Sequence, residues 1–471
     1  MKNIFLSIAV ATTVCALAQN PTQSTRPINR ASEWSKESAL ESKKIDSSKL
    51  IKKTITQEIA LPKALDILID MSGELIISTW NENKIKIETT VQFEEPNELT
   101  DAQWLDKLGI NMKVFGSTVK VKSKSNNVIV YFNNGASTFS SISISPAFNN
   151  GTYFNMQKGA RPVILYIPAE SILEIESKYG NLKIRNNIKS LLLDNTDGEI
   201  EFANIEKLQI RSNRGSFSGG IVTEADIELS HARFALKQLN NGTLTSNYST
   251  IEIESLKDVK LSSSSDDIDV DNVSALYGIK NYGNLSINQL IDKLDLQGIN
   301  SDIKLRHINS SAQLVKIVNR NADLRLSAND LSNFSVDIKG SYNKVYSSFA
   351  ENTTVDTLTT AEIESVKALT NAATTVNPAR IIGTTNNRYS SEENLLVKAL
   401  TKAPTTVSPV RIIGTTNSRY SSAENLLVST ITGYGIGVNK QNPYLKYSAK
   451  RGTGNSPKYQ IICTSCVIDF K

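Results

Sequence analysis

The densest acidic group of the sequence lies in the middle of the chain and consists of Asp266, Asp267, Asp269 and Asp271. Asp267, Asp269 and Asp271 stand at every second position, so their side chains would share one face of a β-strand and could hold Ca²⁺. The glycine and the distal glutamate of a calcium-binding loop are missing, however. We therefore interpret these aspartates as the solvated face of a strand. They remain weak metal candidates only, and the sequence predicts no cofactor.

The histidines and the late cysteines offer little further chemistry. His231 and His307 are the only histidines, and they fall far apart on different repeats, which argues against a zinc site and against acid–base catalysis. Cys463 and Cys466 are spaced Cys-Thr-Ser-Cys near the end of the chain. In an oxidising compartment they are compatible with a local disulfide, although their side chains would diverge on a regular strand. A disulfide or buried free thiols are favoured over metal or redox chemistry.

Three tyrosines recur at equivalent turn positions, Tyr179, Tyr248 and Tyr282, and His231 takes the same place in another copy. Such residues could form an aromatic strip that contacts sugar rings, or they could pack on the next repeat. We take the three tyrosines as candidate ligand contacts and His231 as a turn residue. The sequence contains no nucleophile elbow, phosphate loop or zinc-protease helix, so it predicts no catalytic residues.

A repeating unit must position all of these side chains. Each copy has a small residue followed by alternating polar and apolar residues, and the copies are 17 to 21 residues apart, which indicates a repeat architecture. Each repeat reads as strand, tight polar corner, strand and loop. One repeat would bury three or four apolar side chains, worth about 1.5 to 3 kcal/mol each, which does not order about 17 residues without neighbours. The copies begin at Gly180, Gly198, Gly215, Ala232, Ser249, Asp266, Gly283, Ser301 and Ala322.

Two all-β folds fit this repeat: a β-solenoid (β-helix) with coils of about 17–21 residues, and an antiparallel β-sandwich of repeated hairpins. A column of polar corner residues favours the solenoid, because stacked Asn and Ser side chains about 4.8 Å apart can satisfy one another's hydrogen bonds. Hairpins would gain nothing from such a column. Its members are Asn213, Ser230, Asn247, Ser264 and Asn281, at steps of 17.

The N-terminus and the composition predict export. Residues 1–18 have a basic start, a short apolar run and a small-x-small end, which are typical of a secretory signal peptide. A lipoprotein anchored at Cys15 is less favoured, because no small residue precedes that cysteine. No transmembrane segment is expected after signal removal. Nucleic acid is a poor partner, because 52 basic and 47 acidic residues are interspersed.

The remaining patterns divide the chain into segments. A capping helix is expected near residues 99–109, with Thr100 as N-cap, Gln103 as capping-box partner and Gly109 as stop. The other predicted segments are a polar linker at 19–54, N-terminal strands at 55–175, β-solenoid repeats at 176–358, duplicated 31-residue units at 359–431 and C-terminal closing strands at 432–471.

The 31-residue duplication is the sharpest repeat of the sequence. Residues 366–396 are nearly identical to residues 397–427, and a degenerate form of the same phrase occurs near Gly340. We interpret these units as late copies of a coil already present. On this interpretation the array extends through Gly340, Gly383 and Gly414.

Several features together resemble the bacterial putative adhesin family. They are the signal peptide, the start of the array at Leu65–Ile67 and Gly73–Leu75, the Tyr-Gly-Asn-Leu-x-Ile units at Tyr179 and Tyr282, and the ending Cys463–Phe470. The resemblance covers about residues 55–471. It implies an exported β-solenoid of the adhesin-like kind common in Bacteroidetes, with no established catalytic residues. The duplication and the helix near 99–109 depart from the family pattern.

Three hypotheses about function follow. The first is a non-enzymatic adhesin-like protein that binds a glycan, or an envelope or host protein, in the periplasm, at the outer-membrane surface or after secretion. The second is a polysaccharide-active β-helix enzyme in which Asp267 and Asp269, with a nearby Lys or Arg, would perform acid–base catalysis. The third is an envelope-stress or scaffolding component that binds a membrane partner.

Overall fold

The structure is a computed structural model that describes residues 51–61, 66–93, 98–123, 163–347, 349, 353–375 and 443–471. The predicted signal peptide, most of the linker, Gly383, Gly414 and the second 31-residue unit lie outside the described residues. All described residues belong to one compact unit. Its strands form a single hydrogen-bonded sheet that does not close on itself.

The middle of the unit is a β-solenoid in which each coil contributes two strand segments, and both segments pair in parallel with the coils before and after. Leu191, for example, lies opposite Leu173 on one side and Leu208 on the other. Parallel pairing between segments 17 to 21 residues apart confirms the solenoid and rules out the hairpin sandwich, whose neighbouring strands would be antiparallel. The strands are β8 (Ile172–Ser177), β9 (Leu182–Ile184), β10 (Ile188–Asn195), β11 (Glu199–Phe202), β12 (Ile205–Ser212), β13 (Gly215–Ser230), β14 (Ala232–Asn247), β15 (Thr250–Gln297), β16 (Ser301–Ile308), β17 (Leu314–Arg320) and β18 (Asp323–Leu326).

The core lies between the two strand segments of each coil. Alternate residues point inward, so Ile200, Ile210 and Ile227 are fully buried while the residues between them face outward. The loop expected between repeats is absent from β13, β14 and β15, where the backbone bends and keeps its pairing. This bend is why a single strand such as β15 contains several coils.

The tight corners depend on residues with left-handed backbone conformation, among them His231 (φ 55°), Tyr248 (φ 51°) and Tyr282 (φ 52°). The amide of such a residue donates to a carbonyl of the next coil, as from His231 to Asn247 (2.9 Å) and from Tyr248 to Ser264 (3.1 Å). Stacking therefore continues through the corners by backbone hydrogen bonds. At Asn247 and Ser264 of the predicted Asn and Ser column, the backbone carbonyls thus link the coils. At Asn281 the side chain links them, because it accepts a hydrogen bond from the Ile299 amide of the next coil (3.1 Å).

The N-terminal end departs from sequence order. β2 lies between β6 and β8, and β3 lies between β7 and β9, with parallel pairing on both sides. Antiparallel strands then finish this end, since β5 pairs with β6 while β4 pairs with β7 and β1. The strands are β1 (Ile51–Ala60), β2 (Asp66–Met71), β3 (Leu75–Trp80), β4 (Lys84–Phe93), β5 (Ile110–Phe115), β6 (Thr118–Ser123) and β7 (Val163–Pro168).

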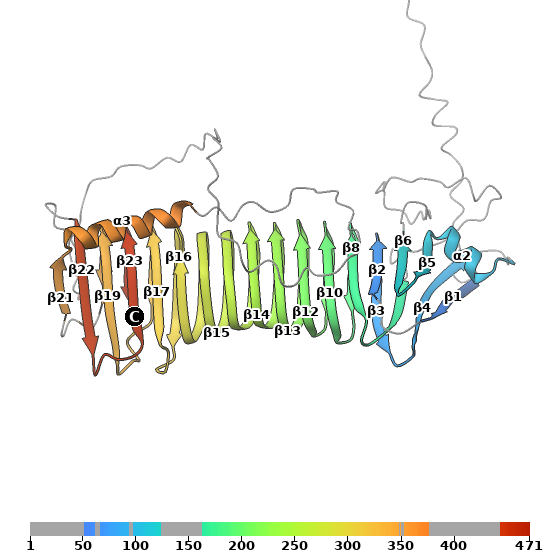
Figure 1. Cartoon of the computed structure of the whole chain (residues 1–471), viewed down its shortest axis with the longest axis horizontal. Helices are drawn as coiled ribbons and strands as arrows, with labels where there is room; N and C mark the ends of the chain where they lie inside the picture. Colours follow the sequence, from blue (N-terminus) through green and yellow to red (C-terminus); the bar gives the residue numbers. More distant parts are fainter. Residues whose placement is uncertain are drawn as a thin grey trace, which may run out of the picture. The chain divides into compact units, whose positions relative to one another are not determined.

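The C-terminal end is also interleaved. β23 lies between β17 and β19, and β24 lies between β18 and β20, again in parallel. Figure 1 accordingly shows the chain's C-terminus among β17, β23 and β19 and not beyond them. β22 and β21 then add to β19 as antiparallel strands. The strands are β19 (Phe334–Ser341), β20 (Lys344–Tyr346), β21 (Thr353–Thr357), β22 (Tyr444–Arg451), β23 (Lys458–Thr464) and β24 (Val467–Phe470).

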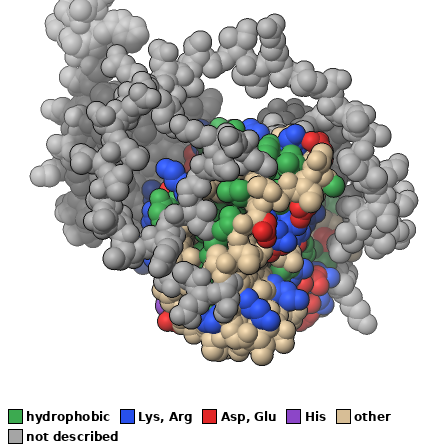
Figure 2. Space-filling view, turned by 90° about the vertical axis from the view of Figure 1, so that its left-hand side faces the viewer, with side chains coloured by type: hydrophobic (Ala, Val, Ile, Leu, Met, Phe, Trp, Pro, Cys, Tyr) green, Lys and Arg blue, Asp and Glu red, His purple; other side chains and the backbone are tan. Residues whose placement is uncertain are grey.

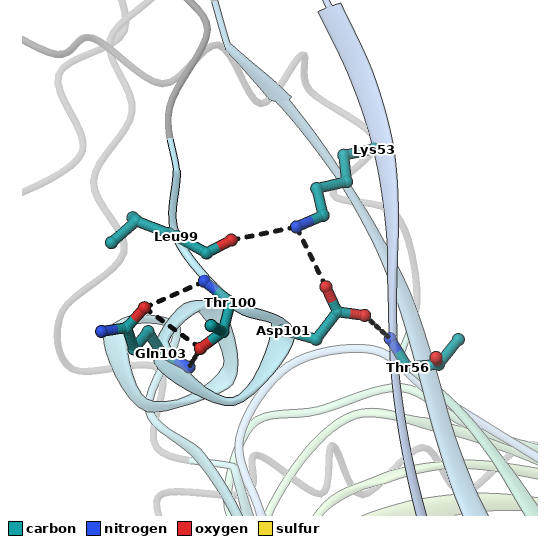
Figure 3. A network of polar contacts seen from close by, with 6 residues as sticks. All are labelled: Lys53, Thr56, Leu99, Thr100, Asp101 and Gln103. Atoms are coloured by element: carbon teal, nitrogen blue, oxygen red, sulfur yellow. Dashed lines mark hydrogen bonds and ion pairs between the residues drawn. The ribbon is translucent and has the colours of Figure 1, made fainter.

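Helix α2 (Asp101–Lys107) forms where the capping box predicts it. The Gln103 amide donates to the Thr100 hydroxyl (3.3 Å), and the Thr100 amide donates to the Gln103 side chain (2.9 Å). Figure 3 shows how Asp101 then holds the helix to β1, through Lys53 (3.0 Å) and the Thr56 amide (3.1 Å). These two contacts lower the pKa of Asp101, the Thr56 hydrogen bond most. β1 begins at Ile51, inside the predicted linker.

Helix α3 (Thr360–Thr375) corrects the interpretation of the first 31-residue unit as a coil. The helix contacts β17, β23 and β19, and Figure 1 shows it running across these strands. A second capping box starts it, since Thr359 and Glu362 exchange backbone-to-side-chain hydrogen bonds. Buried residues of the helix are spaced by one helical turn, since Val366 and Thr370 are both buried.

Candidate functional site

One edge of the solenoid carries a continuous row of corner side chains, which we call the corner ridge. Each coil places one residue on it, immediately before the start of its second strand segment. Neighbouring ridge residues are thus about 4.8 Å apart, the spacing of paired strands. The ridge comprises Tyr179, Asp197, Arg214, His231, Tyr248, Ser265 and Tyr282. The strand arrows that end at this edge, including those of β8, β10 and β12, point the same way in Figure 1.

The aromatic side chains of the ridge are exposed. Tyr179, Tyr248 and Tyr282 are 68%, 59% and 43% exposed. Because all three belong to the ridge, the predicted ligand-contact residues lie on one line. The His231 ring stacks on the Tyr248 ring with centroids 5.2 Å apart, and the Ser230 hydroxyl lies 2.8 Å from His231 Nδ1. His231 is therefore a turn residue, as predicted, but one whose ring belongs to the aromatic row.

Charged residues continue the ridge between Tyr179 and His231. Asp197 and Arg214 occupy successive coils, and their side chains form an ion pair of 4.0 Å. Both side chains stay about half exposed, so their remaining hydrogen-bonding capacity faces solvent. The ridge thus presents flat aromatic faces beside a carboxylate and a guanidinium. Sequence reasoning found the tyrosines but missed this pair, because Asp197 and Arg214 do not share a residue type with the other corners.

Beneath the ridge lies a buried polar cluster centred on Asp266, which is fully buried. Its carboxylate accepts hydrogen bonds from the hydroxyls of Ser246 (2.6 Å) and Ser263 (2.5 Å). It also accepts from the amides of Ser249 (2.7 Å) and Ser264 (3.1 Å). Four donors compensate the burial of one carboxylate. This corrects the sequence interpretation of Asp266 as part of a solvated aspartate group.

Lys280 completes the cluster in the next coil. Its side chain is 1% exposed, and its ammonium donates to the backbone carbonyls of Asp266 (3.0 Å) and Tyr282. Burial lowers the pKa of Lys280 to about 8, although the negative charge of Asp266 opposes that shift. Lys280 therefore holds the backbone of Tyr282 through that residue's carbonyl. The alternation in the sequence could not reveal it, because lysine is rarely a core residue.

The cysteine pair occupies the corresponding corner of the C-terminal coil. The structure joins Cys463 and Cys466 in a disulfide, and both side chains are buried. The divergence expected on a regular strand does not arise, because Ser465 between them is left-handed (φ 59°) and turns the chain. In the neighbouring coil of β17 and β18 the same two inner positions hold Asn319 and Ala322, and on the other side Gly340 of β19 lies opposite Cys463.

The predicted acidic row lies on the outer face of β15 and begins at Asp267, two residues after Ser265 of the corner ridge. Asp267, Asp269 and Asp271 are exposed, and Asp267 accepts a hydrogen bond from the Asn284 side chain (2.8 Å). Across the described ranges, no three His, Cys, Asp or Glu side chains gather closely enough to hold a metal ion. His307 stands on β16, in a different coil from His231.

No helix within the described parts of the chain combines the length and apolar character needed to cross a bilayer. On the described surface, the corner ridge combines exposed aromatic side chains with the Asp197–Arg214 ion pair. The aspartates of β15 lie on an open strand face.

Three solved structures are similar to part of this chain. No curated protein matches the chain. A "putative adhesin" from Bacteroides fragilis is 11% identical, with 57% of this chain and 97% of that chain covered and a TM-score of 0.24. A "putative lipid binding protein" from Parabacteroides distasonis is 14% identical (56% and 96% covered, TM-score 0.23). A "putative cell adhesion protein" from Clostridium sporogenes is 10% identical (47% and 99% covered, TM-score 0.19). At these scores the three structures carry no argument about function.

A comparison with protein families identifies the family of this chain. Residues 82–362, more than half of the chain, match the family described as Toastrack DUF4097, a domain of unknown function. This confirms the resemblance stated from the sequence. The chain belongs to the Toastrack DUF4097 family.

Proposed function

We propose that the protein is a non-enzymatic, adhesin-like β-solenoid of the cell envelope or surface that binds a glycan along its corner ridge. The observation that carries the proposal is the line of exposed Tyr179, Tyr248 and Tyr282 rings at one edge. Aromatic faces suit the apolar faces of sugar rings, and the Asp197–Arg214 pair supplies polar groups that sugar hydroxyls can use.

Backbone conformation supports a role in binding. A bulky residue with positive φ is uncommon and costs about 1 kcal/mol or more, and glycine or asparagine would fill such a corner with less strain. Tyr248 and Tyr282 nevertheless occupy left-handed positions, and they remain 59% and 43% exposed. We infer that the two rings are kept for contact with a ligand.

A glycan array printed with bacterial and host polysaccharides tests the proposal. The purified protein should bind a subset of the array, and a combined Tyr248→Ala and Tyr282→Ala variant should lose at least tenfold in affinity. Tyr277→Ala is the matched control, since Tyr277 is 41% exposed on the outer face of β15 and away from the ridge. Absence of binding to every glycan, or equal loss in the control, contradicts the proposal. Binding to an envelope or host protein alone supports the protein-binding alternative.

Export is part of the same proposal. Protease treatment of intact cells should cleave the protein if it faces outward, whereas a periplasmic protein should be cleaved only after the outer membrane is opened. Protection under both conditions, together with an uncleaved N-terminus by mass spectrometry, would contradict export.

A further inference from the structure

The line of the corner ridge continues for four coils beyond Tyr282. β16, β18, β24 and β20 follow one another in parallel register, so their corners are stacked in the same order. The corner amides continue to donate to the next coil, as from Asn300 to Arg320 (2.8 Å) and from Asn321 to Thr464 (2.9 Å). The four added positions are Asn300, Asn321, Ser465 and Tyr342. Together with the corner ridge they form a line of eleven positions, which we call the full corner row.

The backbone of the full corner row is uniform. Among the described residues, all eight non-glycine residues with positive φ belong to this row. The coils are stacked along the long axis of Figure 1, and Figure 2 looks along that axis from the C-terminal end. A ligand that contacts several positions of the row must therefore lie along the stack.

Only even numbers of coils separate the four tyrosines of the row. Counted from Tyr179, Tyr248 lies four coils along, Tyr282 six and Tyr342 ten. Paired strands are about 4.8 Å apart, so about 10 Å separates Tyr248 from Tyr282 and about 48 Å separates Tyr179 from Tyr342. Tyr342 is 58% exposed, so it faces solvent as the other three tyrosines do. The tyrosines thus recur at multiples of two coils.

The odd positions of the row carry hydrogen-bonding side chains and no tyrosine. They are Asp197, His231, Ser265, Asn300 and Ser465. Polar positions and tyrosines therefore alternate along the row, except that Arg214 and Asn321 occupy even positions.

An extended chain of β-1,4-linked pyranose rings has the same alternation. Each ring is turned over relative to the ring before it, so alternate rings present the same apolar face, and one ring advances the chain by nearly the spacing of one coil. Aromatic side chains suit these apolar faces, and polar side chains bind the hydroxyls. An α-1,4-linked chain winds into a helix instead, so it does not keep alternate rings along a straight row.

We propose that the full corner row binds an extended β-1,4-linked glycan, with one ring per coil and the tyrosines on every second ring. This inference rests on the proposed function and adds the linkage, the direction and the length of the ligand. A three-ring fragment reaches only Tyr248 and Tyr282, whereas a polymer reaches all four tyrosines. Chains of glucose and of N-acetylglucosamine share this linkage, and the test distinguishes them.

Affinity electrophoresis of the full-length protein tests the linkage. The gels contain hydroxyethyl cellulose, glycol chitin or soluble starch, which are β-linked glucose, β-linked N-acetylglucosamine and α-linked glucose polymers. At least one β-linked polymer should retard the protein, and starch should not. Equal retardation by starch overturns the inference, as does no retardation by either β-linked polymer when other glycans on the array bind, and the proposed function then stands. Absence of binding to every glycan contradicts both.

Added tyrosines test the spacing of two coils. Asn300 and Asn321 are both exposed and left-handed (φ 49° and 55°), so replacing either by tyrosine imposes similar strain. Asn321→Tyr adds a ring at an even position and should tighten polymer binding about fivefold. Asn300→Tyr adds a ring at an odd position and should give no gain. Equal effects of the two substitutions overturn the alternation.

Removal of one ring tests the length of the site. Tyr342→Asn should weaken binding of the β-linked polymer about fivefold. The matched control is Tyr346→Asn, because Tyr346 is 43% exposed on β20 of the same coil but lies off the row. Thermal unfolding confirms that each variant is folded. Unchanged binding by Tyr342→Asn, or an equal loss in the control, overturns the extension of the site to Tyr342.

Discussion

The Ser263 hydroxyl donates to the Asp266 carboxylate across a corner, over 2.5 Å, inside a site that solvent does not reach. Asp266→Ala would leave this hydroxyl and three other donors without their acceptor, so we expect the unfolding free energy to fall by about 3 kcal/mol. Asp269→Ala, on the same strand but exposed, should change it by no more than about 0.5 kcal/mol. Urea unfolding followed by circular dichroism measures both, and equal effects would refute a structural role for Asp266.

Lys280 should make the unfolding free energy depend on pH in the alkaline range. Burial lowers its pKa from 10.5 to about 8, so between these values the unfolded chain binds more protons at this residue than the folded chain does. The unfolding free energy contributed here therefore rises with pH across that window. The difference between the protein and a Lys280→Met variant should grow in favour of the unmodified protein, by up to about 3 kcal/mol, from pH 8 to pH 10.5.

The control for this titration is Lys293→Met, because Lys293 is exposed on the same long strand, β15. Its stability difference from the unmodified protein should stay constant over the same pH range. A constant difference for Lys280→Met as well would mean that its ammonium is not buried.

A substitution on the corner ridge should affect the unfolding free energy and glycan binding in opposite directions. Asparagine tolerates the left-handed conformation better than tyrosine, so Tyr282→Asn should leave the unfolding free energy unchanged or raise it by up to about 1 kcal/mol. The same variant should lose glycan binding. Thermal unfolding and titration of one preparation compare the two effects directly. A substantial loss of stability would show instead that the Tyr282 ring packs on its neighbours.

The cysteine pair should be oxidised in exported protein. Intact mass spectrometry after alkylation should find Cys463 and Cys466 unlabelled unless a reductant and a denaturant are both present, because both side chains are buried. Closing so short a loop removes little chain entropy, so a double Cys→Ser variant should lose only about 2 kcal/mol. Labelling of denatured protein without reductant would show that the thiols are free.

Alternation and period were sufficient to predict the solenoid, because core residues such as Ile200 and Ile210 recur at positions fixed by strand geometry. The same information misplaced the polar corner network. By alternation Asp266 falls on the same face as the buried Ile268 and Val270, and it is buried with them, whereas Asp269 is in solvent. Alternation alone does not show which groups compensate a buried carboxylate, because the four donors to Asp266 come from serines of two neighbouring coils.

The order of the strands along the stack could not be predicted from the sequence either. A strand such as β23 carries the alternation expected of a closing strand, and no residue of it specifies that β19, rather than solvent, will cover its second edge. Long-range pairing decides this. Helix α3 was missed for a different reason. Its second half belongs to the first 31-residue unit, which was interpreted as a coil, although Thr359 and Glu362 form a capping box before it.

The interleaved C-terminal coil has a mechanical consequence. A force applied at Lys471 does not peel a last strand from an open edge, because β23 and β24 each pair with parallel strands along both edges. Withdrawal along the strand direction loads the hydrogen bonds on both sides together, in shear. The C-terminal coil should therefore resist pulling better than an outermost coil, which has strand partners along one edge only.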